Sequence, residues 1–117
     1  VLDRQQRTLR LERPDELLPA PAQGALLAEC REEDTAIREA LEGFHHPLTA
    51  RCVTLERAVL RGIGGGCQQP LGALAVPEGE GFRLKAAYAG PGGIAWAEGA
   101  GTDEAALVAE VCRGLGL

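Results

Sequence analysis

The sequence predicts an α+β fold, in which helices cover one face of a three-stranded antiparallel sheet. Between residues 71 and 98, apolar residues recur at every second position in three short runs that Gly-rich segments separate, as expected for strands. In the stretches before and after these runs, apolar residues recur every three or four positions, as they do along the buried face of a helix. The chain has 117 residues, which is enough for one hydrophobic core.

The first 31 residues are expected to be the tail end of an upstream region, and residues 32–117 to form the α+β domain. Residues 1–16 are rich in Arg and Glu, and the chain opens without Met. Residues 17–24 contain two prolines and a glycine, which favour an extended approach bounded by a turn. The apolar run Ala25–Cys30 then has the length of a buried strand. We therefore expect one further strand ahead of the three-stranded sheet.

Three helices are predicted from apolar periodicity and from their end signals. They run between Asp34 and Gly43, from Leu48 to about Arg61, and from Thr102 to near Gly114. Asp34 and Thr102 are the expected N-caps, and Pro47 is expected in the first turn of the second helix. On that helix, Glu56 is expected on a face other than the apolar one. The apolar face of the first helix consists of Ala36, Ile37, Ala40 and Leu41.

The three strands of the sheet are expected at Leu71–Val76, Phe82–Tyr88 and Ile94–Glu98. The segments between them, residues 77–81 and 90–93, are short and rich in glycine. Connections of this kind join neighbouring antiparallel strands, so the sheet is predicted to be a meander. The chain has only four aromatic residues, and its core is therefore expected to be aliphatic.

Composition and charge argue against several classes of protein. The net charge is −5, and no basic stripe with interleaved aromatic residues is present to neutralise phosphates, which argues against a nucleic-acid partner. No apolar stretch approaches the ~18 residues of a membrane-spanning helix, and no export signal is visible. The cysteines lack C-x-x-C spacing, and His45 and His46 have no third ligand at a suitable distance in the sequence. We therefore expect a cytoplasmic protein without a metal site or membrane contact.

A glycine-rich segment, residues 62–66, stands directly before Cys67. Glycines remove side-chain bulk and allow backbone conformations that other residues avoid, so a large ligand can approach the thiol. The segment is not a phosphate loop, because it lacks the Gly-Lys-Ser/Thr ending and follows a predicted helix. Two interpretations stay open on these residues: a thiol displayed for chemistry, or a flexible turn that happens to end in cysteine. Cys30, Cys52 and Cys112 are predicted to be structural.

Four blocks of residues resemble the C-terminal part of the porphobilinogen deaminase family, whose members are also called hydroxymethylbilane synthases. Their order and spacing match across residues 17–76, whereas beyond residue 76 only the strand and helix pattern is similar. The family usually has glycine where this chain has Ala22, a change expected to stiffen the turn slightly. The blocks are Leu18–Ala25, Glu29–Arg31, Thr54–Ala58 and Gly65–Ala73.

The resemblance implies a function in haem biosynthesis. The family joins four porphobilinogen units head to tail, with loss of ammonia, into the linear tetrapyrrole hydroxymethylbilane. Its cofactor is a dipyrromethane, attached by a thioether to the cysteine that matches Cys67. A thiolate suits this attachment because it is a strong nucleophile towards an electrophilic pyrrole methylene. By the same comparison, Gly65 and Gly66 give the growing polypyrrole chain room to move.

The resemblance also implies a role for the N-terminal segment. The residues that match Gln23, Gly24 and Ala25 line the catalytic cleft of the family's first domain through backbone donors. The strand Ala25–Cys30 would lie in a sheet of that missing domain. The catalytic aspartate and most of the arginines that bind carboxylates lie upstream, so this chain is expected to contain no catalytic residue and to be inactive alone. Its expected partners are porphobilinogen, the growing polypyrrole chain and the missing N-terminal domains.

Two further expectations concern association and an alternative function. A strand at Ala25–Cys30 without its neighbours would leave its backbone groups unpaired, so we expect it to be displaced into solvent, to pair with the edge of the three-stranded sheet, or to pair with the same strand of a second copy. The homodimer is the favoured outcome, because the run is apolar. The competing function is a free-standing α+β interaction or redox module that uses Cys67 as a reactive thiol. That alternative leaves the spaced blocks unexplained.

Overall fold

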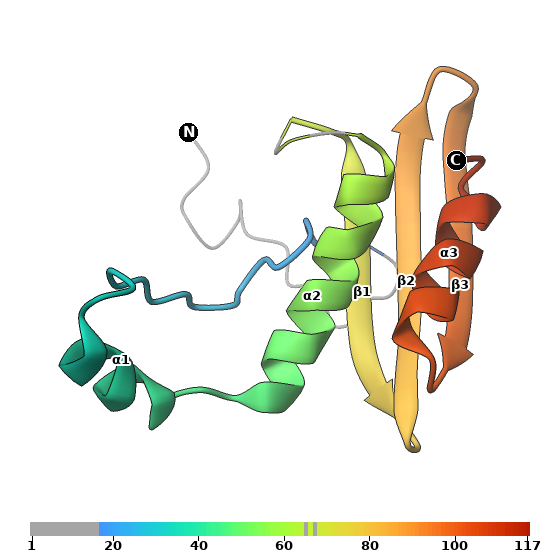
Figure 1. Cartoon of the computed structure of the whole chain (residues 1–117). Helices are drawn as coiled ribbons and strands as arrows, with labels where there is room; N and C mark the ends of the chain where they lie inside the picture. The colour runs from blue at the N-terminus through green and yellow to red at the C-terminus, as the bar shows by residue number, and fades with distance from the viewer. Residues whose placement is uncertain (1–16, 65, 67) are drawn as a thin grey trace, which may run out of the picture.

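The computed structural model describes residues 17–64, residue 66 and residues 68–117. Along them, the elements follow in the order α1, α2, β1, β2, β3 and α3 (Figure 1). Their bounds are α1 Thr35–Glu42, α2 Pro47–Gly62, β1 Leu71–Glu78, β2 Gly81–Gly90, β3 Gly93–Gly101 and α3 Glu104–Gly114. The predicted α+β class is confirmed, while the predictions at residues 1–16, Gly65 and Cys67 lie outside the described residues.

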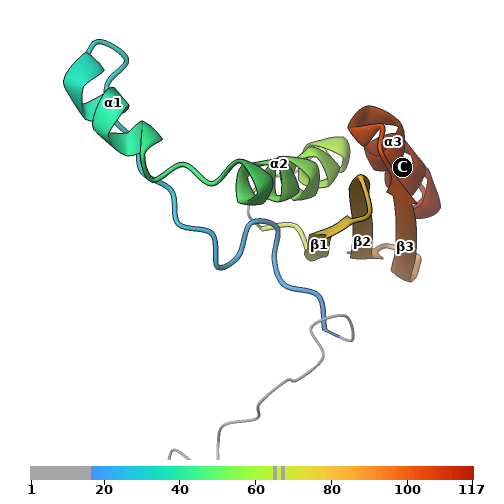
Figure 2. The same cartoon turned by 90° about the horizontal axis from the view of Figure 1, so that it is seen from below.

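The three strands form one antiparallel sheet in the order β1-β2-β3. The register places Ala73, Ala86 and Ala97 opposite one another across the middle of the three strands. Such small side chains let the helices approach the sheet closely. α2 and α3 lie over the same face of the sheet (Figure 2). The predicted meander with helices on one face is therefore confirmed for these two helices.

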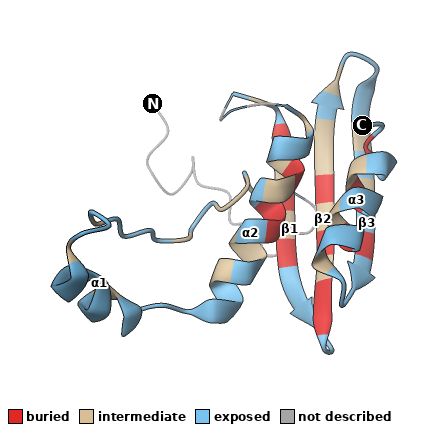
Figure 3. Cartoon of the chain, viewed as in Figure 1, coloured by how far each residue is buried: buried red, intermediate tan, exposed pale blue. Residues whose placement is uncertain are grey.

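The hydrophobic core lies between this face of the sheet and α2 with α3 (Figure 3). Along β2, Phe82 and Leu84 are at most 2% exposed, while Arg83 between them is only partly buried. This alternation is the period-two pattern of a strand with one buried face. The core is aliphatic apart from Phe82, as predicted. Its members are Leu55, Val59, Leu71, Ala73, Ala75, Phe82, Leu84, Ala86, Leu107, Val111 and Leu115.

The ends of the elements correct three details of the prediction. Asp103, not Thr102, caps α3, because its Oδ1 accepts a hydrogen bond from Ala106 N at 3.0 Å. Asp34 precedes α1 as predicted but makes no capping bond; its carboxylate accepts a hydrogen bond from Arg31 Nε at 3.1 Å instead. β1 continues through Pro77, which the sequence placed in a turn. An edge strand tolerates proline because its outward side needs no N–H.

The predicted strand at Ala25–Cys30 is wrong. Residues 25–31 contain neither helix nor strand, and no strand precedes β1 in the described part of the chain. Leu26 and Leu27 are 103% and 72% exposed. A strand needs a neighbour to pair with its backbone groups. The outer edge of β1 does not supply such a neighbour, because residues 18–22 and Glu56 already lie along it, as shown below.

The first helix does not cover the sheet. α1 projects away from the sheet and from the other helices (Figures 1 and 2), and none of its residues is buried. Ile37, on its predicted apolar face, is 51% exposed. The prediction that the helices pack on one face is therefore wrong for α1. None of the helices in residues 17–117 that the structure describes has the length and apolarity needed to span a bilayer.

Candidate functional site

The segment that carries Cys67 joins the end of α2 to the start of β1, and we call residues 63–70 the α2–β1 loop. At its first end, Gly64 N donates to Arg61 O at 2.9 Å. Gly64 has φ +73°, in the left-handed region that glycine adopts without steric strain. The helix therefore ends in a turn that redirects the chain towards the sheet.

The second end of the α2–β1 loop is held by the strands. Gln69 N donates to Gly66 O at 3.2 Å, and Leu71 N donates to Gln69 O at 2.8 Å. Pro70 O accepts a hydrogen bond from Ala89 N, at the end of β2, at 3.0 Å. Both ends of the loop are thus fixed to regular structure, and its position relative to the sheet is set.

The described residues in the middle of the α2–β1 loop are exposed. Gly66 is exposed, and a Cβ added there would meet no atom within 4 Å. Gln68 is also exposed. The two predicted site residues Gly65 and Cys67 lie outside the described residues, so their placement stays a prediction. The described part of the loop leaves space around it for a bulky group.

The other three cysteines are free thiols. Cys52 and Cys112 are half-buried and pack against the core. Burial raises the pKa of both thiols, and the nearby Glu56 carboxylate raises the pKa of Cys52 further. A raised pKa leaves less of the nucleophilic thiolate at neutral pH. These two environments agree with the predicted structural role.

The predicted site residues Gln23, Gly24 and Ala25 form part of a hydrogen-bonded turn. Gln23 N donates to Ala20 O at 2.9 Å, and Ala25 N donates to Ala22 O at 3.2 Å. Ala22 has φ +65° and Gly24 has φ +84°. The left-handed conformation costs alanine roughly 1–2 kcal/mol and costs glycine nothing comparable. A glycine at position 22 would therefore relieve strain in this turn.

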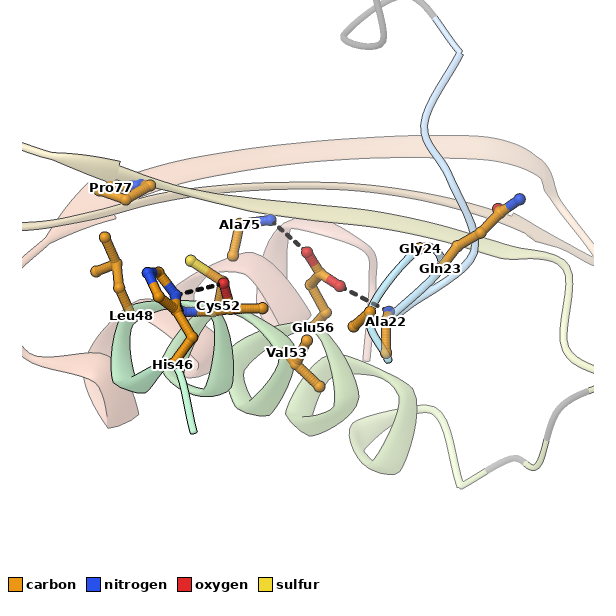
Figure 4. A pocket seen from close by; sticks show the side chains of 12 residues that line it. Ala22, Gln23, Gly24, His46, Leu48, Cys52, Val53, Glu56, Ala75 and Pro77 are labelled. Carbon is orange, nitrogen blue, oxygen red and sulfur yellow. Dashed lines mark hydrogen bonds between the residues drawn. The ribbon is translucent and has the colours of Figure 1, made fainter. Parts of the chain in front are cut away.

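Glu56 fastens this turn to the sheet, as Figure 4 shows. Its Oε2 accepts a hydrogen bond from Ala22 N at 2.7 Å, and its Oε1 accepts one from Ala75 N at 2.9 Å. Glu56 is only 6% exposed, which is unusual for a carboxylate. The carboxylate therefore joins three segments that are far apart in the sequence: the turn, α2 and β1.

The prediction that Glu56 lies off the buried face of α2 is wrong. It follows Cys52 by four residues and precedes Val59 by three, so it belongs to the buried stripe of the helix. A charged residue in the middle of an apolar stripe is the signal that would have identified it. Sequence reasoning missed it because glutamate is rarely buried.

A cavity of about 380 Å³ lies beside the turn. It is lined by residues 22–25, by Cys52 and Glu56 of α2, and by the far end of β1 (Figure 4). No described residue of the α2–β1 loop lines it. The structure therefore does not bring the two groups of predicted site residues together within the described part of the chain. Among those residues, no cluster of His, Cys, Asp and Glu is arranged to hold a metal ion.

Fold and site together define a class: a small α+β domain that displays a glycine-rich loop between a helix and the edge of a sheet. Residues 50–112 match the family model described as "Porphobilinogen deaminase, C-terminal domain". The match includes most of α2, the whole α2–β1 loop, the sheet and nearly all of α3. The chain therefore belongs to the porphobilinogen deaminase family, as its C-terminal domain.

Curated relatives agree with this assignment. A porphobilinogen deaminase of Thermus thermophilus is 48% identical over 81 residues, which are 68% of this chain and 27% of that protein. One of Listeria welshimeri is 45% identical over 80 residues, 67% of this chain and 26% of that protein. One of Acidothermus cellulolyticus is 43% identical over 84 residues, 68% of this chain and 25% of that protein. The chain spans about a quarter of the length of these relatives.

Proposed function

We propose that this chain is the cofactor-carrying part of a cytoplasmic hydroxymethylbilane synthase, which joins four porphobilinogen units, with loss of ammonia, into hydroxymethylbilane. The observation that supports this best is the family match over residues 50–112, which includes the glycine-rich loop and Cys67. The family match also explains the two sequence blocks that lie within it, Thr54–Ala58 and Gly65–Ala73, which a free-standing redox or interaction module leaves unexplained.

Cys67 is the proposed attachment point of the dipyrromethane. To hold it, the thiol would give up its proton as a C–S bond forms at the methylene of a first porphobilinogen unit and ammonia leaves from the broken C–N bond. A second unit would join a ring carbon of the first, which loses a proton, with release of a second ammonia. Once attached, the dipyrromethane supplies the primer for chain growth. The described residues fit such a group, because the space around Gly66 is open and the ends of the α2–β1 loop are fixed.

The turn at Gln23, Gly24 and Ala25 is proposed to line the catalytic cleft together with the upstream part of the longer protein. In the proposed division into domains, residues 1–31 are the end of the catalytic region and residues 32–117 form the cofactor-carrying domain. The catalytic and carboxylate-binding groups are supplied upstream, since the chain spans about a quarter of its relatives. The chain alone should therefore not convert porphobilinogen, and detectable tetrapyrrole formation by the pure chain would contradict this division of labour.

A chimeric enzyme tests the proposal. The matching 27% of the Thermus thermophilus relative, which is 48% identical to this chain, is replaced by the corresponding residues of this chain. We expect the chimera to form hydroxymethylbilane from porphobilinogen, and Cys67→Ser to abolish that activity because a hydroxyl is a far weaker nucleophile than a thiolate.

Cys112→Ser in the same chimera is the matched control. Cys112 is half-buried against the core and lies in α3, so its loss should leave activity largely intact. An active Cys67→Ser chimera, or equal inactivation by both substitutions, would refute the proposed role of Cys67.

A further inference from the structure

The outward edge of β1 has its backbone donors satisfied from outside the sheet. In an edge strand, alternate residues direct their N–H groups away from the neighbouring strand. Along β1 these are Leu71, Ala73 and Ala75, followed by Pro77, which has no N–H. Their acceptors are Gln69 O at 2.8 Å, Pro19 O at 2.9 Å and Glu56 Oε1 at 2.9 Å. At Ala75, the Glu56 carboxylate thus accepts the hydrogen bond that a carbonyl group of a neighbouring strand would otherwise accept.

The second oxygen of the Glu56 carboxylate also accepts a backbone hydrogen bond. Glu56 Oε2 accepts from Ala22 N at 2.7 Å, a short distance typical of charge-assisted hydrogen bonds. None of the ion pairs among the described residues involves Glu56. Two backbone N–H donors therefore stabilise a carboxylate that is 6% exposed.

Two contacts place the turn against the domain: this one, and the hydrogen bond from Ala73 N to Pro19 O just ahead of the turn. Its internal hydrogen bonds, from Gln23 N to Ala20 O and from Ala25 N to Ala22 O, fix its shape but not its place on the domain. Ala22 donates this hydrogen bond while it adopts φ +65°, which is unfavourable for alanine. The hydrogen bond to the carboxylate compensates for that unfavourable conformation.

We infer that Glu56 is a positioning residue, whose carboxylate fixes the Gln23–Ala25 turn relative to the edge of β1. The α2–β1 loop that carries Cys67 enters the sheet at the start of this same strand. The clasp, by which we mean Glu56 with Ala22 N and Ala75 N, therefore sets the turn at a defined place relative to that loop. The geometry of the clasp does not depend on the proposed function; only the use of the turn in a catalytic cleft does.

Amide exchange followed by NMR on the full 117-residue chain tests the clasp. Glu56→Gln keeps the shape of the side chain but replaces one acceptor oxygen by an NH₂ group, which cannot accept. We expect Ala22 N–H or Ala75 N–H to exchange roughly tenfold faster, and the proton resonance of the affected amide to move upfield. Amides of the core strand β2, such as Leu84, should keep their protection.

Glu104→Gln is the matched control. Glu104 also contacts α2, through an ion pair with Arg51, and it lies far from the turn in sequence. This substitution should leave the exchange of Ala22 and Ala75 unchanged. If Glu56→Gln accelerates exchange equally at Leu84, or leaves both clasp amides as they were, Glu56 is not a positioning residue.

A measurement on the unsubstituted chain keeps the inference testable even if Glu56→Gln fails to fold. Scalar couplings across hydrogen bonds should connect Ala22 N and Ala75 N to the side-chain carboxyl carbon of Glu56. Absence of both couplings, in spectra that show them between the strands of the sheet, would overturn the inference. Neither experiment measures catalysis, so failure of the clasp and failure of the proposed function are distinguished.

Discussion

The body of the molecule, residues 47–117, and its arm, residues 17–46, differ in how they place apolar side chains. Every residue of the hydrophobic core lies in the body. The arm has none, although it is rich in large apolar residues that are exposed: Leu17, Leu26, Leu27, Ile37 and Phe44. The arm touches the sheet mainly through Leu18, Pro19 and the turn held by Glu56. We infer that the body folds on its own contacts, whereas the arm is suited to a surface outside this chain.

Core truncation should show the largest difference between the two regions. Leu84 is fully buried and Leu27 is 72% exposed, so the same substitution tests both. Leu84→Ala should lower the free energy of unfolding by about 2–5 kcal/mol, and Leu27→Ala should change it by no more than about 0.5 kcal/mol. Urea unfolding measures both values. A large loss for Leu27→Ala would mean that the arm is buried in solution.

Self-association is the second test, because an exposed apolar arm promotes it. A groove of about 790 Å³ runs between the arm and α2, with Leu26, Leu27 and Phe44 among its walls. If a second copy covers it, sedimentation at micromolar concentration should detect a dimer, and Leu27→Glu should weaken it at least about tenfold. Ile94→Glu, an exposed position in the body, should not. A chain that is monomeric throughout would exclude the homodimer.

Helix capping offers a smaller, closely matched comparison. Asp103 in the body and Asp34 in the arm both stand directly before a helix, but only Asp103 accepts a capping hydrogen bond. Asp103→Ala should destabilise the chain by about 0.5–2 kcal/mol, whereas Asp34→Ala should have little effect. Thermal or urea unfolding compares the two. Equal losses would show that α1 is part of the same cooperative unit as the body.

The smallest expected effect is the contribution of Cys52 and Cys112 to the pH dependence of stability. The pKa of Cys52 and of Cys112 is raised from its usual 9.0, mainly by burial. The folded chain therefore holds these protons more tightly than the unfolded chain, so their contribution to stability is present below pH 9.0 and is lost as pH rises through the folded pKa. Alkylation of the folded, cofactor-free chain at pH 8 should be slow at both and fastest at Cys67. Faster labelling of Cys52 than of Cys67 would contradict the proposed roles.

The same contrast explains how far the sequence could predict the structure. The strands and the helices α2 and α3 were predictable, because their apolar periodicity is buried by contacts within this chain. Ala25–Cys30 has the composition of a strand, but a strand forms only beside another, and this segment pairs with no strand among the described residues. Glu56 was misplaced because burial of a carboxylate depends on two backbone donors, Ala22 N and Ala75 N, that come together only in the folded chain. The roles of Cys67, Gln23, Gly24 and Ala25 stay predictions.

The most direct test of the central claim is a mass measurement on the cysteine peptides of the active chimera. Trypsin separates the four cysteines, with Cys67 alone in residues 62–83. We predict that this peptide carries an added mass equal to two porphobilinogen units less two molecules of ammonia, and that the peptides containing Cys30, Cys52 and Cys112 are unmodified. An active chimera with an unmodified 62–83 peptide, or with the adduct on another cysteine, would contradict the account.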